Sequence, residues 1–356
     1  MTLATLTPVN ISNADFQTML DFGRVIYQLK HNDQYIQKMR AWVPEITLIK
    51  PNYPSVLMGF DFHLTPSGPK LIEINNNAAG LLSWKTKTWL NQPEHAQFKD
   101  DMKRRINAMF PASWKSIAIL DDSVETQFFY PEMQAYAELL SDDGRSVVLL
   151  SPEDLILKED GFLYAGSQKI DGIYNRHTDF YLDIPEMRHI HQAYVSEHVG
   201  LTPHPRSYAL IGDKQRMVDW WQDDFFTHMI SDEDKKLILS VVPTTRNLAK
   251  MERDEVWRDR KKYVFKPAAS HGGKGVLMGK SVRQKRFQEM MEHPENMVVQ
   301  DLVPAPTLLR DDEVFKYDIR LYMTGEKCIA VAARLFQGSV TNFRHPVSGF
   351  YPVNIE

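Results

Sequence analysis

A glycine-rich stretch directly after a lysine is the strongest chemical signal in the sequence. Lys266 ends a short apolar run, and Ser270, Gly272, Gly273 and Gly275 follow it. Glycine has no Cβ, so its backbone N–H groups can approach phosphate oxygens closely, and a lysine can bring positive charge to the same oxygens. The stretch departs from the Walker A and dinucleotide-binding patterns. It therefore predicts either a phosphate-binding loop or an ordinary surface hairpin turn.

Two carboxylates and an amide occupy an early hairpin pattern between residues 55 and 75, where two alternating runs flank a turn. The spacing puts Asp61 opposite Glu73, and Asn75 shares a face with Glu73. Carboxylates directly opposite each other repel unless a cation lies between them, and Mg²⁺ prefers such oxygen ligands. The pattern is typical either of an exposed acidic hairpin or of a magnesium site at Asp61, Glu73 and Asn75.

Arginines gather near the end of two predicted C-terminal strands. Asp318 and Arg320 alternate to one face of the first strand, and Arg334 lies near the end of the second. Asn342 and Arg344 follow. Arginine binds anionic oxygens through two parallel hydrogen bonds, so these side chains are candidates for holding an anionic substrate. Surface ion pairing is the alternative for any one of them.

The mostly apolar run at 297–304 ends in polar residues and a proline. Such a segment can hold a flat base in an apolar slot and read its edge with backbone groups, or it can be a plain buried strand. The residues at its polar end are Gln300, Asp301, Leu302 and Val303.

Three successive patterns predict the elements that position these residues. Residues 1–112 carry a helical pattern from about 12 to 38, the hairpin at 55–75, and a second helix from about 93 to 110. Residues 113–204 alternate short apolar runs with helices, which is typical of a parallel sheet in a Rossmann-like domain. The remaining candidates lie in 205–356.

Composition narrows the function. The 356 residues carry 42 basic and 46 acidic side chains, for a formal net charge of -4, so no global basic field favours nucleic acid or an anionic membrane. A single cysteine, Cys328, excludes an internal disulfide and a multi-cysteine metal site. With no signal-peptide pattern and no apolar run of the roughly 20 residues that span a membrane, we expect a cytoplasmic protein.

Taken together, these signals resemble the ATP-grasp superfamily of ligases, most closely its bacterial glutathione synthetase and ribosomal-protein glutamate-ligase branch. The resemblance implies an α/β protein with an ATP-grasp core in 1–112 and 205–356 and a pre-ATP-grasp domain at 113–204. Gly212-Asp213-Lys214 looks like the first phosphate-binding lysine, and Lys266 looks like the second. The resemblance further implies ATP binding by Ser270, Gly272, Gly273, Gly275, Gln300, Asp301, Leu302, Val303 and Asp318.

The implied activity is an ADP-forming ligation of a carboxylate to an amine through an acylphosphate, on amino-acid or peptide substrates. ATP and one or two Mg²⁺ ions would be needed, with the metal on Asp61, Glu73 and Asn75. Arg334, Arg320, Arg344 and Asn342 would bind the substrate carboxylate and stabilise the transition state. An ATP-dependent phosphotransferase and a non-catalytic nucleotide-binding module are the alternatives. The oligomeric state stays open, with a homodimer among the options.

The order of the motifs departs from the family. The acid-x-Asn strand at 73–75 comes first here, whereas it normally comes last. We expect a circular permutation, in which residues before about 90 fold back beside the C-terminal strands; the alternative is a coincidental match and a missing final strand. Residues 76–80 also lack the family's common Pro-Gly, which leaves the acceptor side undefined.

Overall fold

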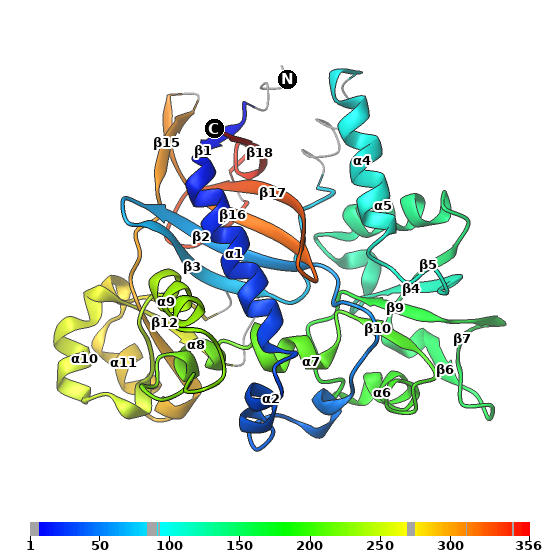
Figure 1. Ribbon diagram of the computed structural model, residues 1–356, viewed down its shortest axis with the longest axis horizontal. Coiled ribbons are helices and arrows are strands. Elements are labelled where there is room, and N and C mark those ends of the chain that lie inside the picture. The colour runs from blue at the N-terminus through cyan, green and yellow to red at the C-terminus, as the bar shows by residue number, and fades with distance from the viewer. Residues whose placement is uncertain (1–6, 84–90, 92, 269–274, 311, 344) are drawn as a thin grey trace.

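A seven-stranded sheet joins strands from both ends of the chain (Figure 1). The computed structural model describes all residues except 1–6, 84–90, 92, 269–274, 311 and 344. The sheet order is β1-β18-β17-β16-β2-β3, with β15 paired to β16. These strands are β1 (Val9–Ile11), β2 (Met58–Thr65), β3 (Gly68–Asn75), β15 (Thr307–Arg310), β16 (Glu313–Thr324), β17 (Lys327–Phe336) and β18 (Gly349–Ile355).

The N-terminal strands lie beside the C-terminal ones, as the sequence predicts. β2 pairs antiparallel with β16, and β1 pairs in parallel with β18. The Asn13 N–H also donates to the Glu356 carbonyl at 2.6 Å, so the two ends of the described chain lie side by side. Closely spaced termini are the condition under which a chain tolerates permutation. The permutation itself stays a prediction.

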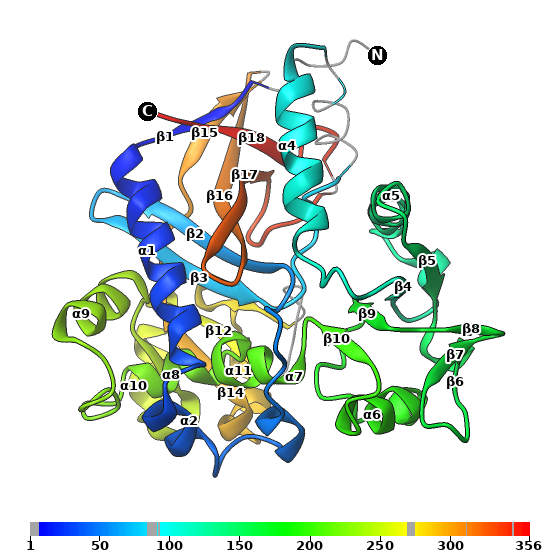
Figure 2. The same cartoon turned by 45° about the vertical axis from the view of Figure 1, so that its right-hand side comes forward.

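Helix α1 (Asn13–Leu29) crosses one face of this sheet (Figures 1 and 2). Ser12 caps its first turn by accepting a hydrogen bond from the Asp15 N–H. Its buried Phe22 ring meets Phe60 and Phe62 of β2 edge-on, at centroid distances of 6.3 and 5.9 Å. These contacts join the first helix and the early hairpin in one apolar core.

The single helix expected from about 12 to 38 is wrong, because the chain breaks after α1 and restarts as α2 (Asp33–Met39). Asn32 causes the restart. Its backbone is extended, and its side chain accepts a hydrogen bond from the Tyr35 N–H, which is the geometry of an N-cap.

The three strands expected in 113–204 form a parallel sheet with a fourth, β10, which the sequence did not predict; the order is β10-β9-β4-β5. The central strands β4 and β9 are buried along their whole length, whereas the edge strand β5 is half-buried or exposed. The elements of this region are β4 (Ser116–Leu120), α5 (Tyr130–Ser141), β5 (Ser146–Leu150), β9 (Gly172–Asn175), α6 (Arg188–Val195) and β10 (Gly200–Thr202). A small antiparallel sheet, which the sequence did not predict, comprises β6 (Leu155–Leu157), β7 (Leu163–Ala165) and β8 (Gln168–Lys169).

A second antiparallel sheet, of order β11-β14-β12-β13, lies below β3 in Figure 1. The glycine-rich residues 269–274 connect β12 to β13 and lie outside the described residues. The elements here are α7 (Pro205–Ser207), α8 (Gln215–Trp220), α9 (Asp232–Val241), β11 (Thr245–Asn247), α10 (Arg253–Asp259), β12 (Tyr263–Pro267), β13 (Leu277–Met278), α11 (Gln284–Met290) and β14 (Met297–Asp301).

Helix α4 (Ala96–Asn107) is shorter than the 93–110 span expected from the sequence. Met102 and Ile106 are buried, whereas Phe98 is 47% exposed. The reason is that the helix is buried along its C-terminal half, while its first turns extend away from the body (Figure 2). Among the described residues, no helix is long and apolar enough to cross a membrane.

We predict that Phe62→Ala lowers the free energy of unfolding by about 3–5 kcal/mol, because truncation leaves a cavity beneath α1. Phe128→Ala is the matched control, since that side chain is 74% exposed, and it should cost less than about 0.5 kcal/mol. Chemical denaturation measures both. A small loss for Phe62→Ala would show that the early hairpin does not belong to the core.

Candidate active site

Four neighbouring strands of the large sheet bring charged side chains to one face. Asp61 of β2 lies opposite Arg320 of β16 on one side and Glu73 of β3 on the other. Asp318 of β16 lies opposite Arg334 of β17. Residues in register across a sheet share a face, so positions that are far apart in the sequence meet here. The predicted Asp61–Glu73 register is confirmed.

Asp61 is the hub of this arrangement. Its carboxylate accepts hydrogen bonds from Arg320 Nε and Nη2, at 2.6 and 2.7 Å, and from Arg334 Nη2 at 2.7 Å. The Asn75 side-chain amide donates a fourth bond at 2.9 Å. Burial acts to raise the pKa of Asp61, but the two guanidinium groups outweigh it and hold that pKa below its usual value. Asp61 is therefore an ionised, fully buried anion between two cations.

This role differs from the metal ligand that the sequence predicts. The repulsion expected between Asp61 and Glu73 is relieved by side-chain cations: Arg320 and Arg334 for Asp61, and Lys214 for Glu73, at 3.3 Å. The four hydrogen bonds leave little of the Asp61 carboxylate for a further ligand. Because Asn75 donates its Nδ2 to Asp61, its Oδ1 is directed away from the carboxylate.

The two arginines differ in how many of their guanidinium nitrogens are already used in hydrogen bonds. Arg320 uses all three nitrogens, since Nη1 also donates to the Ala79 carbonyl at 3.0 Å. Arg334 uses Nε on Asp318 and Nη2 on Asp61, and its Nη1 has no hydrogen-bond partner within the part of the chain that is described. Of the two, Arg334 therefore has a nitrogen that can contact a substrate, whereas Arg320 has a structural role.

Lys266 and Lys214 bring two further cations next to Glu73. Lys266 Nζ donates to the Ile72 carbonyl of β3 at 2.7 Å and to Gln300 Oε1 at 2.6 Å. Burial lowers the pKa of Lys266 to about 8, against a smaller opposing effect of Glu73. Both lysines are almost fully buried, at 5% and 7% exposed. Two buried cations facing one carboxylate form a site that polyanionic phosphates would complete.

The polar end of β14 lies next to these lysines. Gln300 is buried and also donates to Thr245 Oγ1 at 3.2 Å, while Asp301 turns outward to an ion pair with Arg246. The backbone N–H groups of Asp301 and Leu302 bond within the sheet and to a neighbouring loop. The Val303 N–H has no partner among the residues described, which leaves it available to the edge of a base.

His63 is a site residue that the sequence analysis missed. Its Nδ1 lies 2.9 Å from the Val303 carbonyl, which joins β2 to the end of β14. Burial lowers the pKa of His63, against the opposing charge of Asp318. Strand alternation could have found it, because His63 lies two residues beyond Asp61 and shares its face.

Two side chains of the parallel-sheet region form hydrogen bonds with the backbone of residues 76–82, the segment that follows β3. Arg176 Nη1 donates to the Asn77 and Ala78 carbonyls at 3.2 and 3.0 Å. The buried Glu132 carboxylate accepts from the Gly80 and Leu82 N–H groups. Nothing in the spacing of Glu132 singled it out, because it acts on backbone N–H groups distant in sequence.

The remaining predicted residues are placed as follows. Asp318 accepts from Arg334 and from the Thr341 hydroxyl, and Asn342 donates to the Gln337 and Val340 carbonyls, which shapes the turn after β17. Gly275 has a φ of +74° and a Cβ there would meet Pro267. Ser270, Gly272, Gly273 and Arg344 lie outside the described residues.

A magnesium ion would find few ligands in this site beyond Glu73 and Asn75. Among the described residues, no group of three or more His, Cys, Asp or Glu side chains is arranged to hold a metal ion. One carboxylate and one amide oxygen are a partial shell, which is the usual state of a Mg²⁺ site that substrate phosphates complete. The donor set therefore fits a metal that arrives with ATP.

Comparison with known proteins agrees with this fold. Over 98% of its length the chain is similar to a glutathione synthetase-like effector from Globodera pallida, at 9% identity, a TM-score of 0.56 and 89% coverage of that chain. A protein named "Putative gamma-glutamylcysteine synthetase", from Methylobacillus flagellatus KT, matches at 11% identity, a TM-score of 0.56, 98% coverage of this chain and 90% of that one. The chain therefore has the mixed α/β fold of ATP-grasp structures.

Residues 191–341 match the family model of the tubulin-tyrosine ligase family. The matched segment is less than half of the chain, and it contains Lys214, Lys266, Gln300, Asp318 and Arg334. It ends before β18 and excludes the early hairpin. Comparison with curated proteins gives no match.

We predict that Asp61→Asn lowers the free energy of unfolding by about 3–5 kcal/mol in the absence of nucleotide and metal. The reason is that Arg320 and Arg334 stay buried without the negative charge that Asp61 supplies. Glu255→Gln is the matched control. Its ion pair with Arg258 is exposed, at 65% and 66% of the two side chains, so the cost should stay below about 1 kcal/mol. Equal losses for both variants would contradict the assignment of Asp61 to the arginines.

Proposed function

We propose that the protein is an ATP- and Mg²⁺-dependent ligase that joins a carboxylate to an amine, with an amino acid or peptide as substrate. One observation carries the proposal: two buried lysines lie next to Glu73, Lys214 through an ion pair with it and Lys266 of β12 through a hydrogen bond to the adjacent Ile72 carbonyl of β3. The ATP-grasp fold and the ligase-family match over 191–341 support it.

In this proposal the lysines bind the phosphates of ATP, and the Val303 N–H and the backbone around it bind the adenine. Glu73 and the Asn75 Oδ1 would hold Mg²⁺, which supplies charge neutralisation to the transferred phosphoryl group. Asp61 positions Asn75 by accepting from its Nδ2. Lys266 is held by Gln300 and the Ile72 carbonyl, so its ammonium group is oriented before the nucleotide arrives.

Arg334 is the residue we propose for the reacting carboxylate. Asp318 and Asp61 fix two of its nitrogens, and the third can donate to an oxygen of the substrate or of the acylphosphate. Residues 76–82, fixed by Glu132 and Arg176, lie next to the metal-binding strand and would line the substrate side. No enzyme nucleophile is required.

An ADP-release screen with amino acids and dipeptides tests the proposal, with hydroxylamine present to trap an acylphosphate as a hydroxamate. Lys266→Ala and Glu73→Ala should each lower turnover by about 100-fold or more. Lys236→Ala and Glu233→Ala, on the exposed face of α9, are matched controls that should keep full activity.

Other products would replace the proposal with a different one. A stable phosphorylated product without hydroxamate would identify a phosphotransferase. Nucleotide binding without turnover across the panel would indicate a non-catalytic module, and AMP with pyrophosphate would contradict the ADP-forming chemistry.

We also predict that the affinity for a non-hydrolysable ATP analogue falls as pH rises from 7 to 9. The protonated form of Lys266 binds the phosphates, and the free protein loses that proton near pH 8, whereas an ordinary lysine keeps it to about 10.4. The loss should approach tenfold per pH unit above 8. Lys266→Met should bind weakly with a flat profile over this range. A flat profile in the unmodified protein would exclude Lys266 from phosphate binding.

A further inference from the structure

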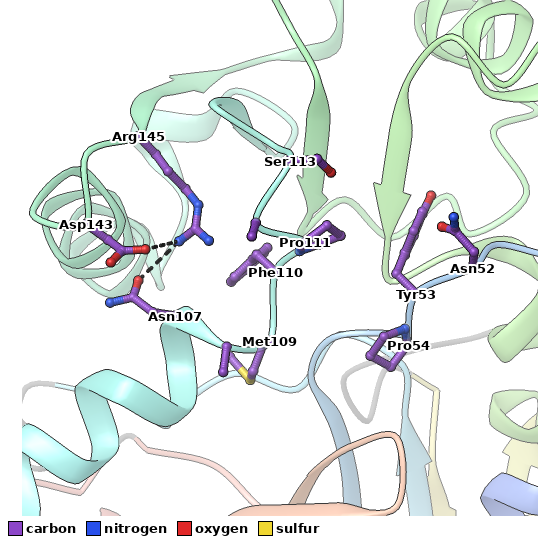
Figure 3. A pocket seen from close by; sticks show the side chains of 12 residues that line it. Asn52, Tyr53, Pro54, Asn107, Met109, Phe110, Pro111, Ser113, Asp143 and Arg145 are labelled. Atoms are coloured by element: carbon purple, nitrogen blue, oxygen red, sulfur yellow. Dashed lines mark hydrogen bonds and ion pairs between the residues drawn. The ribbon is translucent and has the colours of Figure 1, made fainter.

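A solvent-open cavity of about 610 Å³ (Figure 3) has a lining that includes no residue of the charged network of the large sheet. It is bounded by the end of α4 and the chain that follows it, by residues 52–54 before β2, and by the turn that precedes β5. It thus lies at the amino-terminal ends of β4 and β5, where the parallel sheet meets the rest of the molecule. Its volume falls within the range of about 300–1,000 Å³ that is typical of small-molecule sites.

The cavity contains an arginine whose hydrogen bonds are incomplete. The Arg145 side chain is 6% exposed, and one nitrogen, Nη1, makes both of its contacts, with Asp143 Oδ2 at 2.9 Å and Asn107 Oδ1 at 3.3 Å. Nε and Nη2 have no partner among the described residues. Figure 3 shows the second terminal nitrogen directed away from Asp143 and Asn107, on the side of Phe110. These free donors suit the two oxygens of a carboxylate.

Aromatic and proline side chains supply an apolar part of the cavity lining. Phe110 packs edge-on against Tyr174, at a centroid distance of 5.4 Å, and Tyr53 packs edge-on against Trp114 at 5.0 Å. The Tyr53 hydroxyl also accepts a hydrogen bond from the Leu201 N–H at 2.9 Å. Pro54 and Pro111 belong to the same part of the lining. Preformed aromatic and proline surfaces favour a flat apolar group and cost little ordering on binding.

We propose that this cavity is a second ligand site, which binds a small organic carboxylate with a flat apolar body. The carboxylate pairs with Arg145, and the body lies between Tyr53 and Phe110. The site is separate from the proposed nucleotide site, so the inference does not depend on the proposed function.

Phenylacetate is the probe, and phenylacetamide is its neutral isostere. Isothermal titration calorimetry on the full chain should show saturable phenylacetate binding that is at least about tenfold tighter than phenylacetamide binding, since a charge-assisted bidentate pair is lost in the amide. Absence of saturable binding up to millimolar concentrations, or equal affinity for the two probes, would overturn the proposal.

Three variants locate the binding. Arg145→Gln should weaken phenylacetate binding by about tenfold or more, whereas Arg104→Gln, an exposed arginine (72%) outside the cavity lining, should leave it unchanged. Asp143→Asn removes the competing carboxylate from Arg145 and should tighten phenylacetate binding several-fold without affecting phenylacetamide. The Asp143 side chain is 47% exposed, so Asp143→Asn should fold, and it tests the proposal even if Arg145→Gln does not fold. Unchanged affinity in Asp143→Asn would overturn the assignment to Arg145.

Discussion

The ion pairs of Asp61 with Arg320 and Arg334 are the interaction on which the rest of the site depends. They join β2, from the start of the chain, to β16 and β17, from its end. A fully buried carboxylate is tolerable only when its partners are in place, so the ionised state of Asp61 and the pairing of the two chain ends require each other. The same carboxylate orients Asn75, which places the structural hub next to the proposed metal ligand.

The second constraint is the contact between the seven-stranded sheet and the β11-β14-β12-β13 sheet. Lys266 belongs to β12 but donates to the β3 backbone, and His63 of β2 contacts the Val303 carbonyl at the end of β14. These two contacts set the distance between the proposed adenine-binding strand and the proposed metal-binding strand. A nucleotide that spans them would bring its phosphates to Lys214, Lys266 and Glu73, which is why the geometry favours phosphate chemistry over an exposed ion-pair cluster.

The sequence predicted the hairpin register, the parallel sheet and the return of the N-terminal strands to the C-terminal ones, because each rests on local alternation or on a motif. Two opposed carboxylates indicate a cation without saying whether it is a metal or an arginine; the structure pairs Asp61 with Arg320 and Arg334, and its role as a metal ligand stays a prediction. The sequence analysis missed His63, whose partner is a backbone carbonyl 240 residues away. Likewise, Glu132 acts on backbone N–H groups, so its side-chain type carried no motif.

A structure of the protein with Mg²⁺ and a non-hydrolysable ATP analogue tests the central claim most directly. The account predicts phosphates between Lys214 and Lys266, the metal on Glu73 and Asn75, and Asp61 still paired with Arg320 and Arg334. A metal bound by Asp61 with those ion pairs broken, or a nucleotide bound away from Lys266, would contradict it.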